Sequence, residues 1–76
     1  MKELIEFVVN ALVDDPATIE VTEVVGDKVT IFELRADKAD IGKIIGKRGK
    51  TIMAIRSLVS GAAGRLKKRV TVEVVD

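Results

Sequence analysis

The sequence contains neither cysteine nor histidine, and these two absences exclude several kinds of site. Without cysteine the chain can form no disulfide framework and no thiolate metal site. Without histidine as well, zinc has almost no side chain to bind, because these two residue types supply most protein zinc ligands. We therefore expect no metal, no cofactor and a cytoplasmic protein.

Catalytic side chains are scarce for the same reason. His, Cys and Tyr are all absent, so carboxylates, lysines and hydroxyls are the groups that remain for acid–base or nucleophilic chemistry. No pair of them stands at a recognisable spacing. We expect a protein that is not an enzyme and that has no small-molecule substrate.

Aromatic residues are limited to Phe7 and Phe32, although 47% of the 76 residues are hydrophobic. The hydrophobic core must therefore be built from Val, Ile, Leu and Ala. A chain of this length forms one domain and buries only about 60% of the surface that its unfolded state exposes. We expect a single domain over residues 1–76, held together by many aliphatic contacts.

Long apolar runs are also missing. Glu3 and Glu6 interrupt the N-terminal segment where a signal peptide would be basic and then continuously apolar. No other stretch approaches the roughly 18 apolar residues of a membrane-spanning helix. We expect a soluble, unprocessed protein without a membrane partner.

The net charge of +1 conceals a strong asymmetry along the chain. Residues 1–34 carry two basic and eight acidic residues, a sum of −6, whereas residues 35–69 carry eleven basic and two acidic residues, a sum of +9. Such asymmetry is typical of proteins with a polyanionic partner. The alternative is a solvated basic face with no partner.

Apolar spacing predicts three helices. Residues 2–13 carry apolar side chains at intervals of three and four, and Asp14-Asp15-Pro16 should end this first helix. A short helix is expected over residues 38–45, with the Asp37 carboxylate capping its first turn and Gly46 ending it. A longer helix should begin after Gly49, with one apolar stripe formed by Ile52, Ile55, Leu58, Val59, Ala62 and Leu66.

Three segments are predicted to be strands. Residues 18–25 and 28–35 are mostly β-branched and flank Gly26-Asp27, which predicts a hairpin. Val24-Val25 breaks the alternation of the first strand and suggests a bulge. Valines alternate with polar residues over residues 69–75, which indicates a third strand. The predicted order is helix, strand, strand, helix, helix, strand: an α+β domain with helices packed on one face of a three-stranded sheet.

The stretch IGKIIGKRGKTI, residues 41–52, is the main candidate site. It ends like a phosphate-binding loop of nucleotide hydrolases, but that motif requires a glycine where Ile44 stands and a buried strand where a short helix is expected. The remaining pattern is Gly46-Lys47-Arg48-Gly49 between two helices. Its glycines let another backbone approach closely, and the next helix begins with free amides and a positive pole.

These residues resemble those of a known family. The run IIGKRGKTI resembles the signature of KH domains, in which a GXXG loop clamps about four single-stranded nucleotides. The order of elements resembles the type II, prokaryotic KH fold, whose sheet is mixed. The length, together with ADIGKIIGKRGKTI, AIRSLV and KKRVTVEVVD, resembles the small standalone bacterial KhpA family over essentially the whole chain.

The resemblance implies a noncatalytic single-stranded RNA-binding protein that acts as an RNA chaperone or post-transcriptional regulator. It further implies a homodimer, a heterodimer with a larger KH-containing protein (KhpB, also called Jag or EloR), and a link to cell elongation and division, and hence to cell shape and cell wall biogenesis. The RNA-binding residues that we expect are Lys43, Ile45, Gly46, Lys47, Arg48, Gly49, Lys50 and Ile52.

Two questions about RNA binding stay open at this level. The family's base-binding groove lies near Ile41, Ile44, Ile45 and Ile52, and the sequence does not say which of them face RNA rather than the core. No aromatic residue is near, so bases cannot stack on side chains, and binding should be weak and only modestly selective. The rival hypothesis is a protein-interaction module with a vestigial loop, against which Lys47 and Arg48 argue because they remain at the loop tip.

The last helix raises two further alternatives. Gly61-Ala62-Ala63-Gly64 repeats the G-x-x-G spacing without charge, either because the helix packs closely against the sheet or the first helix, or because it forms a self-association surface. Lys67 stands where KH domains usually have a glycine before the last strand. Either that turn has another shape, or the basic cluster at Arg65, Lys67, Lys68 and Arg69 forms a second phosphate-facing patch or a solvated helix end.

Overall fold

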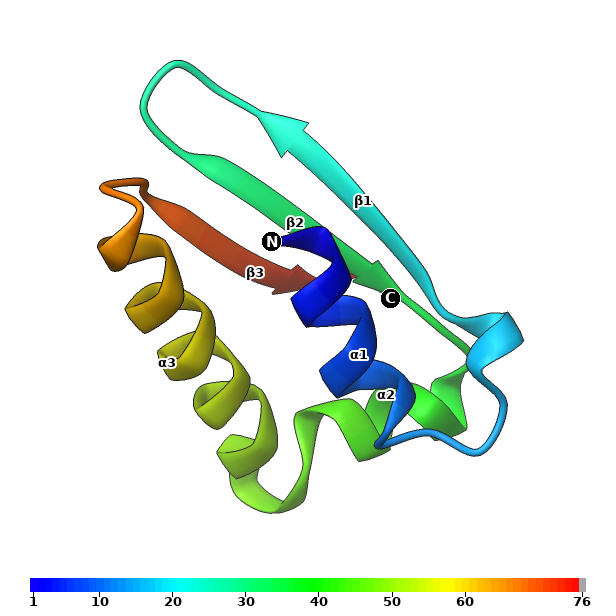
Figure 1. Ribbon diagram of the computed structural model, residues 1–76. Helices are drawn as coiled ribbons and strands as arrows, with labels where there is room; N and C mark the ends of the chain where they lie inside the picture. The colour runs from blue at the N-terminus through cyan, green and yellow to red at the C-terminus, as the bar shows by residue number, and fades with distance from the viewer. Residues whose placement is uncertain (76) are drawn as a thin grey trace.

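The computed structural model describes residues 1–75 and confirms the predicted order of elements (Figure 1). Two 3-10 helices accompany three α-helices and three strands. The elements are α1 (Lys2–Asn10), η1 (Pro16–Thr18), β1 (Glu20–Val25), β2 (Thr30–Arg35), α2 (Lys38–Ile45), η2 (Lys47–Gly49), α3 (Lys50–Arg65) and β3 (Val70–Val74). Within residues 1–75, no helix is both long enough and apolar enough to cross a membrane.

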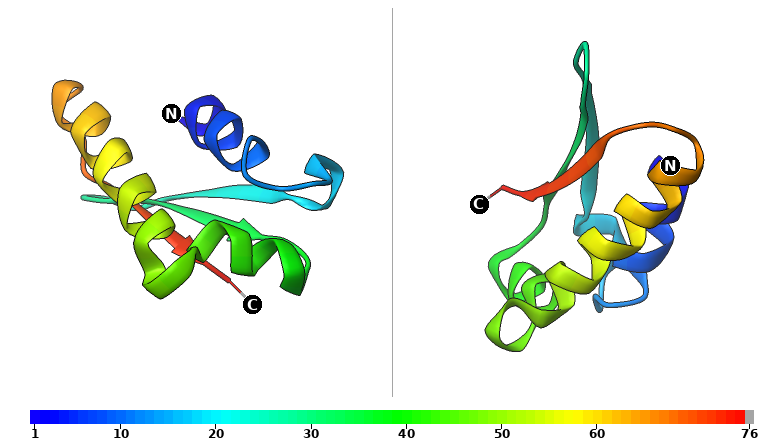
Figure 2. Two further views of the ribbon diagram at one scale, coloured as in Figure 1. Left: turned by 90° about the horizontal axis from the view of Figure 1, so that it is seen from below. Right: turned by 90° about the vertical axis from the view of Figure 1, so that its left-hand side faces the viewer.

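The sheet is mixed, as predicted. Its strand order is β1-β2-β3, with β1 antiparallel and β3 parallel to the central β2. In the right-hand view of Figure 2, α1 and α3 lie on the same side of the β1–β2 hairpin, and the other side of the hairpin is uncovered. The side chains of Val21, Phe32, Leu34 and Val72 are buried on the helix side.

The core is almost entirely aliphatic. Phe32 is its one aromatic side chain, whereas Phe7 is exposed. The fully buried side chains are Phe32, Ile5, Leu34, Ile44, Val9, Val59 and Val72. Burial of each contributes about 1.5–3 kcal/mol, so stability rests on many moderate contributions.

The bulge suggested at Val24-Val25 is wrong. Val24 pairs with Ile31 and Val25 with Thr30 in an unbroken antiparallel register. Both valines are exposed, Val25 by 72%, because the end of the hairpin extends past the helices that cover the rest of the sheet (Figure 1). The alternation therefore breaks because no helix packs on this part of the hairpin, and not because the strand contains an extra residue.

Two predicted boundaries at the N-terminal end also shift. The first helix ends at Asn10, and the Leu12 amide then donates to the Val9 carbonyl (3.0 Å) in a tighter turn that brings Val13 to the core. The first strand begins only at Glu20, because Pro16–Thr18 forms a 3-10 turn whose Ala17 amide donates to the Asp15 carboxylate (3.1 Å). Local hydrogen bonds override the apolar and β-branched patterns here.

The predicted carboxylate cap of α2 is also wrong. The Asp37 side chain makes no capping hydrogen bond, and only its backbone carbonyl accepts from the Ile41 amide (2.8 Å). Another aspartate, inside α2, makes a structural hydrogen bond. Asp40 is buried and accepts a hydrogen bond from the Thr18 hydroxyl (2.9 Å), which fastens η1 to α2.

The apolar stripe of α3 is narrower than predicted. Its buried residues are Ile52, Ile55, Val59 and Ala63, whereas Leu58 and Leu66 are 50% and 60% exposed. Leu58 is one residue, about 100° of helix rotation, away from Val59 and so leaves the buried face. The packing explanation for Gly61 and Gly64 also fails, because a methyl group at either position would meet nothing within 4 Å.

The turn after α3 has the shape that glycine usually provides. The Lys67 amide donates to the Gly64 carbonyl (3.0 Å) and the Lys68 amide to the Ala63 carbonyl (2.9 Å), the two bonds of a Schellman motif. Lys67 has φ +56° and so adopts the left-handed conformation that motif requires. Of the alternatives for Lys67, a differently shaped turn is therefore excluded.

Replacing Lys67 by glycine should raise the free energy of unfolding by about 1 kcal/mol, because glycine adopts positive φ without the Cβ clash of lysine. Urea denaturation of the two proteins measures this change. Lys68→Gly is the matched control, since Lys68 has no positive φ and glycine there should lower stability by about 0.5–1 kcal/mol. Equal effects of the two substitutions would contradict the assignment of backbone strain to Lys67.

Candidate nucleic-acid interface

The glycine-rich loop reverses the chain between α2 and α3. The Gly46 amide donates to the Gly42 carbonyl (2.9 Å) at the end of α2, and the Gly49 amide donates to the Gly46 carbonyl (3.1 Å) within the loop. Gly46, Arg48 and Gly49 have φ values of +76°, +59° and +73°. Three positive φ values in four residues explain why the reversal needs glycine at both ends.

The two loop glycines are required for different reasons. Gly46 has φ +76° and ψ +174°, a region that only glycine adopts readily, and a Cβ there would lie 2.1 Å from Thr51 Oγ1. Gly49 is left-handed, but a Cβ there would meet nothing within 4 Å. The first glycine therefore permits a close internal contact with α3, and the second permits only the backbone turn.

Cations gather at the tip of this loop. Lys47, Arg48 and Lys50 are exposed and line a shallow hollow together. Within residues 1–75 none of the three forms an ion pair. The first turn of α3 has no acidic residue and no side-chain cap, so its positive pole faces the same region. This arrangement suits an anion such as a phosphate.

Lys43 differs from these three cations because it has a partner. Its ammonium group forms an ion pair with the carboxylate of Asp14, which follows α1. The hydrogen bond that Lys43 donates to the Asp14 carboxylate raises the pKa of Lys43 above its usual value. Both side chains are exposed, and pairs of this kind contribute little to stability. A phosphate that approaches Lys43 therefore meets a cation whose charge Asp14 already partly balances.

The isoleucines near the loop are mostly part of the core. Ile44 is fully buried, and Ile41 and Ile52 are 7% and 6% exposed. Ile45 is only partly buried and is the one of the four that a ligand can reach to any extent. The predicted wall of isoleucines is thus reduced to Ile45, while Ile44 and Ile52 fix the two sides of the loop.

Arg56 is a basic residue of this region that the sequence pattern did not mark as functional. Its Nε donates to the carbonyl of Val72 (3.0 Å), which joins the middle of α3 to β3. No periodic signal indicates this contact, because it depends on how α3 packs against the sheet. The sequence does contain a related signal: between Asp40 and Glu73 there are nine basic residues and no acidic one.

The model of the KH domain of KhpA and KhpB matches residues 2–74. The chain belongs to the KhpA/KhpB family. Relatives named "RNA-binding protein KhpA" cover nearly the full length: the one from Caldanaerobacter subterraneus is 47% identical over 99% of this chain and 100% of its own. Those from Borreliella burgdorferi and Aquifex aeolicus are 45% and 36% identical, over 97% and 100% of this chain and 90% and 96% of their own.

A solved structure agrees with the fold of this KhpA/KhpB family member. The crystal structure of a variant of Era from Aquifex aeolicus matches 96% of the chain with a TM-score of 0.61. The identity is 23%, and the match covers 28% of the Era chain, so it bears on the fold alone. The type II KH architecture implied by the loop residues and the order of elements is thereby confirmed.

Replacing Gly46 by alanine should lower the free energy of unfolding by about 1–3 kcal/mol, since the added Cβ meets Thr51 and the backbone is strained for any L-residue. Urea denaturation followed by circular dichroism measures the loss. Gly42→Ala is the matched control: it lies inside α2, its Cβ would meet nothing within 4 Å, and it should gain about 1 kcal/mol. A Gly46→Ala protein as stable as its parent would contradict this account of the loop.

Proposed function

We propose that the chain is a noncatalytic single-stranded RNA-binding protein and that residues 1–76 act as one KH domain. The observation that carries this proposal is the loop at residues 46–49, where a glycine-dependent reversal presents unpaired cations beside the positive pole of α3. A sugar-phosphate backbone is the anion that such a loop accommodates. The relatives named RNA-binding proteins support the same function.

In this proposal Lys47, Arg48 and Lys50 contact phosphates directly. The glycines let the strand approach the loop backbone, and Ile45 offers a small apolar contact for a base or ribose. Lys43 joins after releasing Asp14, whereas Ile52 supports the site from the core. Since neither the loop nor α3 carries an aromatic side chain for stacking, affinity should come mainly from phosphate contacts, with little sequence preference.

The resemblance to KhpA proteins extends the proposal to cellular roles. A cytoplasmic protein with modest selectivity suits an RNA chaperone or post-transcriptional regulator. A KhpB-type partner would connect it with cell elongation and division. The rival is a protein-interaction module whose basic loop binds an acidic protein surface, and RNA titration separates the two.

A homodimer is the second part of the proposal, and the outer face of α3 is its best-supported surface. Leu58 is half exposed there and lines a mainly apolar hollow with Ser57, Gly61, Ala62 and Arg65. Gly61 has open space above it, so a second helix can approach closely. Two linked domains of weak individual affinity gain avidity for a long RNA, and the same face suits the KH domain of a KhpB-type partner.

Changing Lys47 and Arg48 together to aspartate should abolish binding to a short single-stranded RNA in low-salt titrations. Each aspartate repels phosphate, a cost of several kcal/mol and therefore a loss of at least about 100-fold. The fold should persist, because both residues are exposed and aspartate tolerates the left-handed conformation of Arg48.

The matched control is Lys2→Asp with Lys38→Asp. These residues are exposed at the first positions of α1 and α2, so the charge change is identical but lies away from the loop. This control should keep RNA affinity within about threefold. Parent-like binding by the loop variant would refute the loop assignment and leave the protein-interaction hypothesis.

Sedimentation of the parent at micromolar concentration should give a species of twice 8.2 kDa. Leu58→Glu should convert it to the monomer, because the interface would have to remove a carboxylate from water in place of an apolar side chain. Phe7→Glu is the control, since Phe7 is 76% exposed on α1 and should leave the dimer intact. A parent that sediments only as the monomer removes the homodimer from the proposal.

A further inference from the structure

Two basic residues stand in an unfavourable backbone conformation at opposite ends of α3. Among residues 1–75, Arg48 (φ +59°) and Lys67 (φ +56°) are the only residues other than glycine with positive φ. Glycine would adopt either position without strain, so in both places the chain keeps a cation at a cost in stability. Arg48 belongs to the loop of the proposed RNA site. Lys67 also combines a positive charge with a positive φ, which points to a second function at the other end of α3.

A concavity lies beside Lys67, between the β1–β2 turn and the α3–β3 turn. The Thr30 amide donates to the Arg69 carbonyl (2.9 Å) and joins the two turns. The volume of the concavity is about 390 Å³, within the range of small-ligand sites. Its charged lining residues are Glu23, Asp27, Lys28, Lys67, Lys68 and Arg69.

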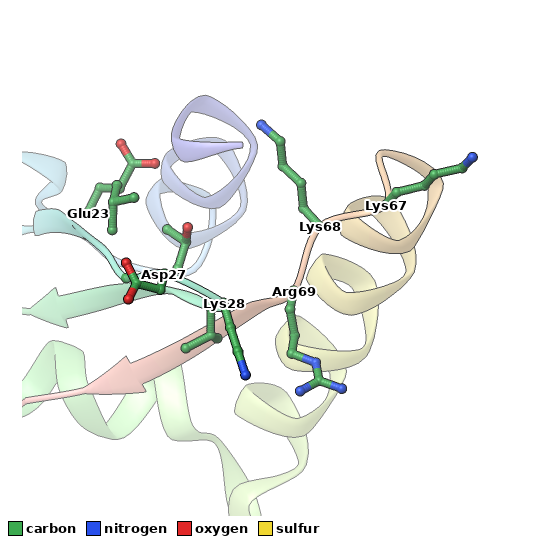
Figure 3. A pocket seen from close by; sticks show the side chains of 10 residues that line it. Glu23, Asp27, Lys28, Lys67, Lys68 and Arg69 are labelled. Atoms are coloured by element: carbon green, nitrogen blue, oxygen red, sulfur yellow. The ribbon is translucent and has the colours of Figure 1, made fainter.

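The charges in this concavity are arranged unevenly. In Figure 3 the side chains of Lys28 and Arg69 extend to the same side of the ribbon, whereas those of Glu23 and Lys68 extend to the other side. Lys67 points outward from the turn. Within residues 1–75 neither Lys28 nor Arg69 forms an ion pair. Two unpaired cations that share one side of a concavity attract an anion.

We propose that this concavity is a second phosphate-binding site, in which Lys28 and Arg69 hold the backbone of the same RNA strand that the loop at residues 46–49 grips. Lys67 adds positive charge at its rim. The inference rests on the proposed function, because it needs a strand bound at the loop. The second site extends that function, because it requires a longer RNA strand than the loop alone accommodates.

One basic residue, Arg56, lies between the two sites, and α3 has no acidic residue. Sixteen residues of α3 separate them, a length of about 24 Å. Arg56 lies partway along and faces β3, to which it donates its hydrogen bond. A stacked strand that rises about 3.4 Å per nucleotide crosses 24 Å in about seven nucleotides. The full site therefore exceeds the four or so nucleotides of the loop.

This path does not conflict with the proposed dimer. Leu58 is two residues beyond Arg56, which rotates it by about 200° around the helix. The β3 side of α3 is thus left to RNA, while the Leu58 side is left to a second protein.

The test compares two single-stranded RNAs, of about four and about twelve nucleotides, by fluorescence anisotropy. The variant is Lys67→Gly with Arg69→Gln, which removes two charges while glycine preserves the turn. Its Kd for the longer RNA should rise about tenfold, and the slope of log affinity against log salt should decrease by about 1.4. Its Kd for the shorter RNA should stay within about twofold. Lys2→Gln with Lys38→Gln is the charge-matched control and should behave as the parent.

The outcomes separate the two proposals. A variant that binds the longer RNA as tightly as the parent overturns the second site and leaves the loop assignment intact. Equal losses for both RNAs also overturn it, because they indicate a general charge effect. A parent that binds neither RNA overturns the proposed function and the second site together.

Discussion

The reversal between α2 and α3 is the constraint on which the site depends. It takes four residues, three of which have positive φ, and Gly46 leaves no room for a Cβ beside Thr51. Strain of this kind costs about 1–3 kcal/mol per residue where glycine is not used. Ile44 and Ile52 lie on either side of the loop and are buried, each contributing about 1.5–3 kcal/mol. Core packing therefore holds an unfavourable loop in a single conformation.

The same helix also determines how charge is distributed. Arg65, Lys67 and Lys68 lie near the negative pole of α3, where cations are favourable for the helix itself. Lys47, Arg48 and Lys50 lie at the positive pole, where cations reduce its stability by about 0.3–1 kcal/mol each. Helix electrostatics favours the charges of the first group, although it does not explain why Lys67 stands at a positive φ, and it disfavours the second group. The loop cations are thus better explained by a ligand than by folding, which is the physical basis of the proposed function.

Sequence reasoning succeeded where a local period or a glycine requirement decides the structure. The order of elements and the alternation of Val70, Val72 and Val74 follow from spacing, and the end of α2 follows from Gly46. It failed where packing against distant segments of the chain decides which side chains are buried. The exposure of Val25 and Leu58 and the narrow stripe of α3 depend on which surfaces the helices reach.

The candidate site shows the same division. Glycines at both ends of a charged dipeptide predicted the loop, because the backbone itself demands them. The partners of two cations were not predictable: Lys43 meets Asp14 and Arg56 meets Val72, across 29 and 16 residues of chain. Neither pair has a periodic or local signature, so both follow only from the packed fold.

The absence of aromatic side chains has a consequence for how such a site would select its ligand. Stacking is worth about 1–3 kcal/mol per base where it occurs, and this chain has no aromatic residue between Phe32 and its end. Affinity must then come from phosphate contacts, which every strand offers and which salt weakens. Affinity can still be gained by adding contacts along the RNA backbone. These contacts can come from a longer binding site or from a second copy of the domain. In our proposals, the cations at both ends of α3 serve the first and the apolar outer face of the same helix serves the second.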